Sequence, residues 1–464
     1  MAAEPSVTPG KRRPAVTRRF PDGFLWGAAT SAYQVEGATE AGGRGESIWD
    51  RFCREPGRVA GGARGDVACD HYRRWRDDVA LLARLGLNAY RFSIAWPRLL
   101  PEGRGRVAAE GLGHYDRLID ALLWHGITPV VTLYHWDLPQ ALQAAGGWRN
   151  RDTAERFGDY AALCFEHFGD RVRYWVTQNE PWIVAVLGHE LGVHAPGEQD
   201  VAGSVRAAHH LLLSHGRAAA ALAATGQDAM VGLAYSLFPH YPATASAADS
   251  AASWASDGYV NRWYLDPVLR GSYPRDTAGR YERAVGPLDF IRPGDLAAIG
   301  ARCDFVGVNY YTRRRVHADP SGGRWPWRVA AAQDGVPVTD AGWEIVPRCL
   351  TDLLLRLHSD YAAPRLLITE NGGVFGEQPG PDGRVRDQRR VRFLREHLTA
   401  VHAAIEGGAN VLGYCHWSLL DNFEWSLGYQ PRFGLVHVDY GSQRRTVKDS
   451  GFYLAQVAAA NALT

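Results

Sequence analysis

The chain alternates between short apolar runs and longer stretches in which apolar residues recur every three or four positions. The short runs are rich in β-branched and aromatic residues, which is typical of buried strands, whereas the longer pattern is typical of helices with one apolar face. Eight strands are expected, at Phe24–Thr30, Ala89–Ile94, Thr128–Tyr134, Tyr174–Thr177, Met230–Leu237, Phe305–Tyr311, Leu366–Thr369 and Val411–Leu419. The clearest helices are expected between them, at His71–Leu85, Gly111–His125, Thr153–Phe168, Val205–Thr225, Cys349–Tyr361 and Gln388–Glu406.

Regular alternation of strand and helix predicts an α/β fold with a parallel sheet and right-handed crossovers. Eight such units favour a single (β/α)8 TIM barrel, and we expect residues 20–464 to form it. Two connections, Pro239–Trp263 and Thr312–Trp343, are long, and long loops after barrel strands build the active-site face. A doubly wound sheet is the alternative, but no Gly-x-Gly-x-x-Gly follows the first strand and opens a helix.

Residues 1–19 hold five basic side chains among Pro, Ser, Thr and Ala and predict a disordered basic tail. Docking of this tail on nucleic acid or a membrane is the less favoured alternative. No apolar segment of the kind found in secretory signals follows it, and no run approaches the length of a membrane-spanning helix. We therefore expect a cytoplasmic protein without a membrane partner.

The composition of the chain narrows the chemistry that it can perform. The chain is 46% hydrophobic and 22% charged, which provides material for a core, and its formal net charge of +1 gives no reason to expect a nucleic-acid partner. Six cysteines are scattered without a Cys-x-x-Cys pair, so no metal site is expected. No phosphate-binding loop or Ser-His-Asp arrangement stands out, and we expect no cofactor.

Polar and aromatic residues lie at or just beyond the ends of seven of the eight expected strands. The C-terminal ends of barrel strands meet around one pocket, so side chains there converge although they come from distant parts of the sequence. A polar residue that ends one strand is commonly a cap, but capping does not explain the same pattern on seven strands. The residues concerned are Gln34, Arg91, His135, Trp136, Asn179, Glu180, Asn309, Tyr311, Glu370, Asn371, Trp417, Glu424 and Trp425.

Glu180 and Glu370 are the two carboxylates that such a pocket would bring together. Each follows an apolar strand and adjoins an amide, which argues against two unrelated surface glutamates. Two carboxyls that flank a glycosidic bond hydrolyse it with retention when about 5–5.5 Å apart and with inversion at about 6.5–9.5 Å; the sequence leaves that distance open. Sixteen Trp and twenty Tyr suit a sugar, because aromatic rings stack on the C–H faces of pyranoses.

Four motifs, in order along the chain, resemble those of glycoside hydrolase family 1, the β-glucosidase family. The resemblance runs from Phe20-Pro-Asp-Gly-Phe-Leu-Trp-Gly to Val447-Lys-Asp-Ser, nearly the whole chain. It implies a retaining β-glycosidase, in the first place a β-glucosidase, that acts on β-glycosides and short oligosaccharides such as cellobiose. The motifs are Tyr134-His-Trp-Asp-Leu-Pro, Thr177-Gln-Asn-Glu-Pro, Ile368-Thr-Glu-Asn-Gly and Leu419-Leu-Asp-Asn-Phe-Glu-Trp.

The resemblance also implies roles for individual residues. Glu180 would be the acid/base and Glu370 the nucleophile. Arg91 and Tyr311 would neighbour the nucleophile, and Asn309 would lie near the acid/base. The nonreducing sugar would be held by Gln34, His135, Asn179, Trp417, Glu424, Trp425 and Phe433, and Trp343 would lie on the aglycone side.

The substrate can be narrowed further at two points. The carboxylate of Glu424 would repel a phosphate in the region where relatives that cleave phosphorylated sugars bind it, so an unphosphorylated sugar is expected. The aglycone is expected near the loops that carry Trp182, Trp325 and Trp327, in addition to Trp343. Glucose, galactose and fucose all remain open as the preferred sugar.

The two carboxyls are expected to differ in charge. Arg91 should stabilise the anion of Glu370 and Tyr311 should donate to it, so Glu370 should ionise readily. That anion should hold Glu180 protonated near neutral pH, ready to protonate the leaving oxygen. Two other interpretations stay open: a transglycosylase that uses the same residues, and a protein that binds sugars without turnover.

Overall fold

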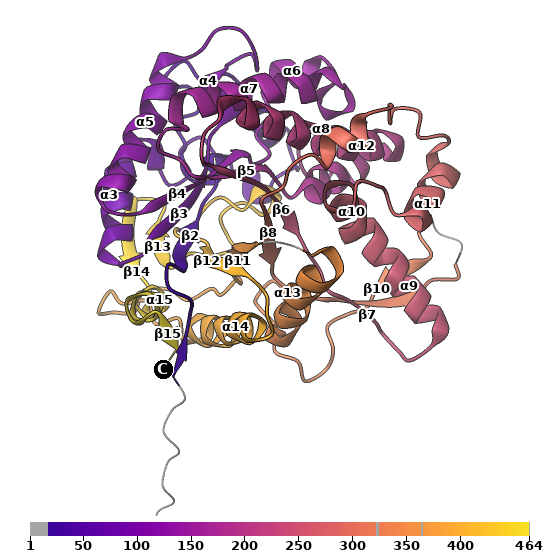
Figure 1. Ribbon diagram of the computed structural model, residues 1–464. Helices are drawn as coiled ribbons and strands as arrows, with labels where there is room; N and C mark the ends of the chain where they lie inside the picture. The colour runs from indigo at the N-terminus through magenta and orange to yellow at the C-terminus, as the bar shows by residue number, and fades with distance from the viewer. Residues whose placement is uncertain (1–16, 322–323, 363–364, 464) are drawn as a thin grey trace, which may run out of the picture.

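The computed structural model describes residues 17–321, 324–362 and 365–463, and its centre is a closed barrel of eight parallel strands (Figure 1). Neighbouring strands follow the order β11-β12-β2-β3-β4-β5-β6-β8, and β8 pairs with β11 to close the ring. The predicted TIM barrel is confirmed. Its strands are β2 (Leu25–Ala29), β3 (Ala89–Ser93), β4 (Thr128–Tyr134), β5 (Tyr174–Asn179), β6 (Met230–Ser236), β8 (Phe305–Tyr310), β11 (Leu366–Asn371) and β12 (Val411–Trp417).

Helices surround the barrel, as Figure 1 shows, and all six that the sequence predicts are present within four residues of their expected bounds. Their buried faces pack on the strands, and their polar faces meet water. The main helices are α3 (His71–Arg84), α5 (Ala109–Trp124), α7 (Asp152–Phe168), α8 (Val201–Thr225), α13 (Pro347–Tyr361), α14 (Gln388–Glu406) and α15 (Asp449–Ala460). Shorter ones are α1 (Ala32–Val35), α2 (Ile48–Arg54), α4 (Trp96–Leu99), α6 (Gln140–Ala144), α10 (Trp263–Leu269), α11 (Arg275–Val285) and α12 (Asp295–Ile299).

Two barrel strands extend further than their apolar pattern predicts. Strands β5 and β11 continue for two residues beyond the predicted ends at Thr177 and Thr369. Backbone pairing persists there although the side chains turn polar. Glu370 therefore lies within its strand, and Glu180 follows directly after Asn179.

The two long connections fold against each other instead of remaining irregular loops. His240 of β7 (His240–Pro242) pairs with Arg314 of β9 (Arg314–Ala318), so the first connection adds a strand to the second. Strand β10 (Trp327–Val329) completes a three-stranded sheet, and α9 (Ala247–Asp257) packs on β9. This layer lies at the side of the barrel, in orange and rose in Figure 1.

The predicted tail is too long by at least two residues. Arg18 and Arg19 form β1, which pairs antiparallel with β15 (Ala462–Leu463). Residues 1–16 of the predicted tail lie outside the described residues. The described part of the chain also contains an antiparallel hairpin, β13 (Val436–Asp439) and β14 (Arg444–Val447). None of its helices combines the length and apolarity that crossing a membrane requires.

Candidate active site

A cavity of about 270 Å³ opens at the C-terminal ends of the barrel strands, and both predicted catalytic glutamates line it. We call it the carboxyl cavity. Ten of the thirteen predicted site residues line it: Gln34, His135, Glu180, Tyr311, Trp343, Glu370, Trp417, Glu424, Trp425 and Phe433. The other three, Arg91, Asn179 and Asn309, are buried beneath it and contact the two glutamates or each other.

Glu180 is held in an uncommon backbone conformation directly after β5. Its φ is +51°, in the left-handed region that side chains with a β-carbon rarely adopt. The pairing of β5 with β6 is irregular between Val176 and Asn179, and the N–H of Glu180 donates to the carbonyl of Ala234 at 2.8 Å. Irregular pairing re-aims a side chain at a strand end, and here the carboxyl of Glu180 faces the cavity.

Glu370 is held by two strong donors. Arg91 Nη1 donates to its Oε1 at 2.5 Å, and the hydroxyl of Tyr311 donates to its Oε2 at 2.5 Å. The Arg91 side chain is fully buried, so its charge acts on Glu370 with little screening by water. Both contacts stabilise the ionised carboxylate.

A chain of amides connects the surroundings of the two glutamates. Asn309 Nδ2 donates to Glu180 Oε1 at 2.7 Å and to Asn179 Oδ1 at 3.1 Å, and Arg91 Nη2 donates to the same Asn179 oxygen at 2.6 Å. Thr369 Oγ1 donates to Asn309 Oδ1 at 2.6 Å, which fixes the direction in which the Asn309 amide points. The positions of both carboxyls therefore depend on one buried network.

The two glutamates are asymmetric in charge. Burial and, as expected but as the smaller cause, the charge of Glu370 together raise the pKa of Glu180 to about 8. Burial also raises the pKa of Glu370, while Arg91 and Tyr311 lower it. The pKa of Glu370 stays above its ordinary value on balance, so the expectation that Arg91 and Tyr311 let it ionise readily leaves out the larger effect of burial. Arg91 contacts Glu370, whereas the donor to Glu180 is the neutral amide of Asn309. Of the two glutamates, Glu370 is therefore the one that ionises first as the pH rises.

A third carboxyl lies on the opposite wall. Gln34 Nε2 donates to Glu424 Oε2 at 3.2 Å and to the Phe423 carbonyl at 2.8 Å, and Ser31 Oγ donates to Gln34 Oε1 at 2.7 Å. Burial, and secondarily the charge of Glu370, raises the pKa of Glu424 to about 8. Gln34 and Glu424 thus present fixed donors and acceptors side by side.

Aromatic rings close the same wall. His135 stacks on Trp417 and on Trp425, with ring centroids 5.8 and 6.1 Å away, and its Nε2 accepts from Asn179 Nδ2 at 3.0 Å. Trp136 packs 4.5 Å from Trp425, and its Nε1 donates to the Asn179 carbonyl at 2.9 Å. Stacked rings beside fixed polar groups match the two faces of a pyranose.

Several lining residues have no role in the site that the sequence predicts. Trp136 is predicted at a strand end beside His135 but without a role in the site, and Ser236 ends β6, the one strand for which no strand-end residue is predicted. His194, Ile183, Leu187 and Phe238 come from connections, including the π-helix η3 (Ile183–Glu190), and have no strand-end pattern.

A second cavity of about 660 Å³ adjoins the first and shares Ile183, Leu187, Phe238 and Trp343 with it. We call it the aromatic cavity. It also contains Trp182 and Trp325, two tryptophans expected near the aglycone. The third, Trp327, is not among its lining residues and stacks on Trp325 with ring centroids 5.3 Å apart.

Arg390 of α14 ties together two loops at the cavity mouth. Its buried guanidinium donates to the carbonyls of Gly373 at 2.7 Å and Phe375 at 3.2 Å, in the loop after β11. It also donates to the carbonyls of Phe433 and Arg432, both at 3.1 Å, in the segment after β12. Val374 and Phe433 from these two loops line the carboxyl cavity.

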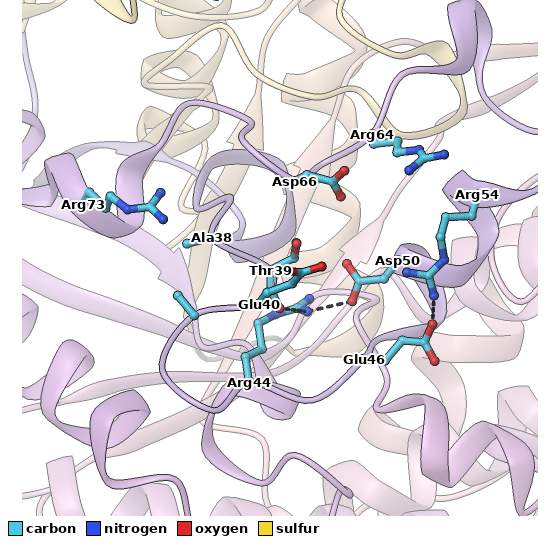
Figure 2. A pocket seen from close by; sticks show the side chains of 11 residues that line it. Ala38, Thr39, Glu40, Arg44, Glu46, Asp50, Arg54, Arg64, Asp66 and Arg73 are labelled. Atoms are coloured by element: carbon cyan, nitrogen blue, oxygen red, sulfur yellow. Dashed lines mark hydrogen bonds and ion pairs between the residues drawn. The ribbon is translucent and has the colours of Figure 1, made fainter.

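A larger hollow of about 850 Å³ lies elsewhere on the molecule, between residues 38 and 73 (Figure 2). We call it the charged hollow. Arg44 contacts Asp50 at 2.7 Å, and Arg54 forms an ion pair with Glu46, as the dashed lines in Figure 2 show. Its charged lining consists of Glu40, Glu46, Asp50, Asp66, Arg44, Arg54, Arg64 and Arg73. It contains none of the predicted site residues.

Comparisons with known proteins agree with the fold. The model described as glycosyl hydrolase family 1 matches residues 16–463. Beta-glucosidase A of Acetivibrio thermocellus is 46% identical over 95% of this chain and 98% of its own. Beta-glucosidase of an Agrobacterium species is 42% identical over 95% of both chains. A family 1 β-glucosidase structure from Thermotoga maritima, in complex with isofagomine lactam, superposes with a TM-score of 0.93 at 45% identity and covers 97% of this chain and 100% of that one.

Proposed function

The chain belongs to glycosyl hydrolase family 1, and we propose that its Glu370 is the nucleophile and its Glu180 the acid/base of a double displacement at the anomeric carbon. The protein is a retaining β-glycosidase, and its relatives at 42–47% identity include several β-glucosidases. We assign it the hydrolysis of unphosphorylated β-glucosides, including short oligosaccharides such as cellobiose, from the nonreducing end.

One observation carries the assignment of roles. Both glutamates line one cavity, but only Glu370 contacts the cation of Arg91, whereas Glu180 has a neutral amide donor. A nucleophile must be ionised and an acid must keep its proton at the same pH. The asymmetry supports Glu370 in the first role and Glu180 in the second.

In the first step, Glu370 attacks the anomeric carbon while Glu180 gives its proton to the leaving oxygen. The glycosidic bond breaks, and an ester forms between the sugar and Glu370. This ester is neutral, so Glu180 loses the neighbouring charge that raises its pKa. Glu180 can then take a proton from water, which attacks the anomeric carbon and releases the sugar and Glu370.

We infer that the nonreducing sugar lies against the wall formed by Gln34, His135 and Glu424. Its hydroxyls would replace contacts that these groups now make with each other. Trp417 would stack on the C–H face, while Trp425 and Phe433 enclose the sugar. Asn179 is buried beside His135, to which its Nδ2 donates at 3.0 Å, and its amide would contact the sugar 2-hydroxyl.

The experiment combines a panel of nitrophenyl glycosides with a covalent trap. Hydrolysis of the β-glucoside is expected, and incubation with an activated 2-deoxy-2-fluoroglucoside should label a single peptide that contains Glu370. A label on another residue would remove Glu370 from its role. Absence of hydrolysis would instead favour a sugar-binding protein, and product analysis with added alcohol would reveal a transglycosylase.

A further inference from the structure

The aromatic cavity holds a charged side chain for which the proposed chemistry has no use. Arg314, the first residue of β9, packs between two rings of the cavity wall. Its guanidinium carbon lies 4.8 Å from the ring centroid of Trp182 and 4.2 Å from that of Phe238. These contacts hold the guanidinium in place, since both rings offer their faces to the cation.

The guanidinium of Arg314 lacks the polar contacts that its neighbours have. Arg313 donates to Glu344 at 2.7 Å, and Arg315 donates to the carbonyl of Ala243 at 3.1 Å. Among the described residues, the Arg314 side chain forms no hydrogen bond and no ion pair, unlike those of its two neighbours. Five N–H donors without a protein acceptor can all bind a ligand. Burial lowers the pKa of Arg314 to about 10, in line with its lack of a carboxylate partner in the described part of the chain.

The acidic residues of the aromatic cavity are already engaged. Glu190 accepts from the Tyr259 hydroxyl at 2.8 Å and from Trp325 Nε1 at 3.1 Å, and Arg324 lies 3.9 Å from it. Glu344 is the partner of Arg313. Arg314 is therefore the cation of this cavity that is left for a ligand, within the part of the chain that the structure describes.

The aromatic cavity lies on the side to which a leaving group must depart. The N–H of Ile183 donates to the carbonyl of Glu180 at 2.9 Å, and Ile183 and Leu187 line both cavities. Glu180, the proposed acid, therefore lies close to the residues that the two cavities share, and a leaving group that takes its proton would extend toward the aromatic cavity. Five aromatic residues, Trp182, Phe238, Tyr259, Trp325 and Trp343, and several aliphatic side chains line this cavity, which suits a flat apolar group.

We propose that the aromatic cavity selects β-glucosides whose aglycone is a phenol with a carboxylate at its far end, and that Arg314 is the specificity-determining residue that binds this carboxylate. The phenol ring would pack among Trp182, Trp325 and Trp343, and the planar guanidinium would bind both carboxylate oxygens. The inference rests on the proposed function, because it concerns the leaving group of the same reaction.

The test compares two substrates that differ in one charge: the β-glucosides of 4-hydroxycinnamic acid and of its methyl ester. At neutral pH we expect kcat/KM of the acid to exceed that of the ester by about tenfold, as for one charge-assisted hydrogen bond. The ester withdraws electrons more strongly and is the better leaving group, so this preference cannot arise from the chemical step. In Arg314→Met the ratio should fall to about one, and Arg314→Lys should retain part of it.

Arg315→Met is the matched control, because Arg315 lines the same cavity but its guanidinium contacts a protein carbonyl. It should keep the wild-type ratio. Arg314→Gln supplies a second variant without the charge, should the methionine variant fail to fold. A ratio near one in the wild type, or a tenfold ratio that survives in both charge-free Arg314 variants, overturns the inference. Failure of the wild type to hydrolyse 4-nitrophenyl β-glucoside would instead overturn the proposed function.

Discussion

The carboxyl cavity and the charged hollow are both lined by acidic side chains, but they differ in size, charge balance and contact with water. The hollow is about three times larger, at about 850 against 270 Å³, and is lined by four acids and four arginines. The cavity is lined by three carboxyls, Glu180, Glu370 and Glu424, and no arginine or lysine is among its described lining residues. The cation that compensates it, Arg91, lies behind the wall.

The contrast shows what prepares carboxyls for catalysis. Burial without a cationic partner raises their pKa, whereas a large number of charges or a large hollow does not. In the charged hollow, Asp50 and Glu46 have arginine partners, and Asp50 also caps α2. In the carboxyl cavity, burial raises the pKa of Glu180 and Glu424 to about 8. Protons are thus retained near neutral pH only where water and cations are scarce.

The sharpest test removes one acid from each region. Glu370→Gly should lower kcat by about 10⁴-fold or more, because no other group can form the glycosyl ester. Azide should restore part of the activity and give a glycosyl azide of inverted configuration, which nuclear magnetic resonance identifies. Asp66→Asn, an exposed acid of the charged hollow, is the control and should change kcat/KM by less than about twofold. Undiminished turnover in Glu370→Gly would contradict the mechanism.

The second test separates the acid from the nucleophile. Glu180→Ala should lower kcat/KM by about 10²–10⁴-fold for substrates with poor leaving groups such as cellobiose, which need the proton. Activated aryl glucosides such as the 2,4-dinitrophenyl compound should lose far less, since their leaving oxygen needs no proton. Steady-state rates on a series of aryl glucosides measure the difference. Equal losses across the series would argue against general acid catalysis by Glu180.

The third test concerns stability. Glu424 has a pKa of about 8 when folded and near its ordinary value, about 4.5, when unfolded. Below pH 4.5 both states are protonated, and between pH 4.5 and 8 only the unfolded state ionises, so the folded protein loses stability as the pH rises. Glu424→Gln removes this loss and should raise the free energy of unfolding at pH 7 by on the order of 2–3 kcal/mol. The gain should vanish at pH 4, as chemical denaturation can show.

Asp66→Asn is again the control and should change the free energy of unfolding by no more than about 0.5 kcal/mol at either pH. A pH-independent gain in Glu424→Gln would mean that packing, not charge burial, distinguishes the two regions.

The smallest expected effect concerns the backbone of Glu180, which has a φ of +51°. Glycine adopts this conformation without strain, whereas alanine retains the β-carbon. The free energy of unfolding of Glu180→Gly should therefore exceed that of Glu180→Ala by about 1 kcal/mol, although both variants lack the carboxyl. Chemical denaturation of the two variants measures this difference. If the alanine variant were the more stable one, the left-handed backbone at this position would not be a source of strain.

The barrel could be predicted from the sequence because the period of its apolar residues changes from strand to helix eight times. The site could be predicted where polar residues interrupt that pattern at strand ends, as at Glu180 and Glu370. The long connections gave no such signal. Their strands β7, β9 and β10 form by pairing with each other, and β7 is far from β9 in the sequence, so no local pattern predicts them. His194 and Phe238 line the cavity for the same reason, and no local pattern marks them.

The role of Arg390 has a consequence for protein engineering. One helix-borne side chain holds four carbonyls of two loops, so those loops form a single unit whose anchor lies outside the cavity. Libraries that randomise Val374 or Phe433 to change the accepted sugar will therefore sample side chains on a fixed frame. Substitutions at position 390 will instead remove the hydrogen bonds that hold the two loops. In those variants both the shape of the cavity and the selectivity for the sugar will be lost.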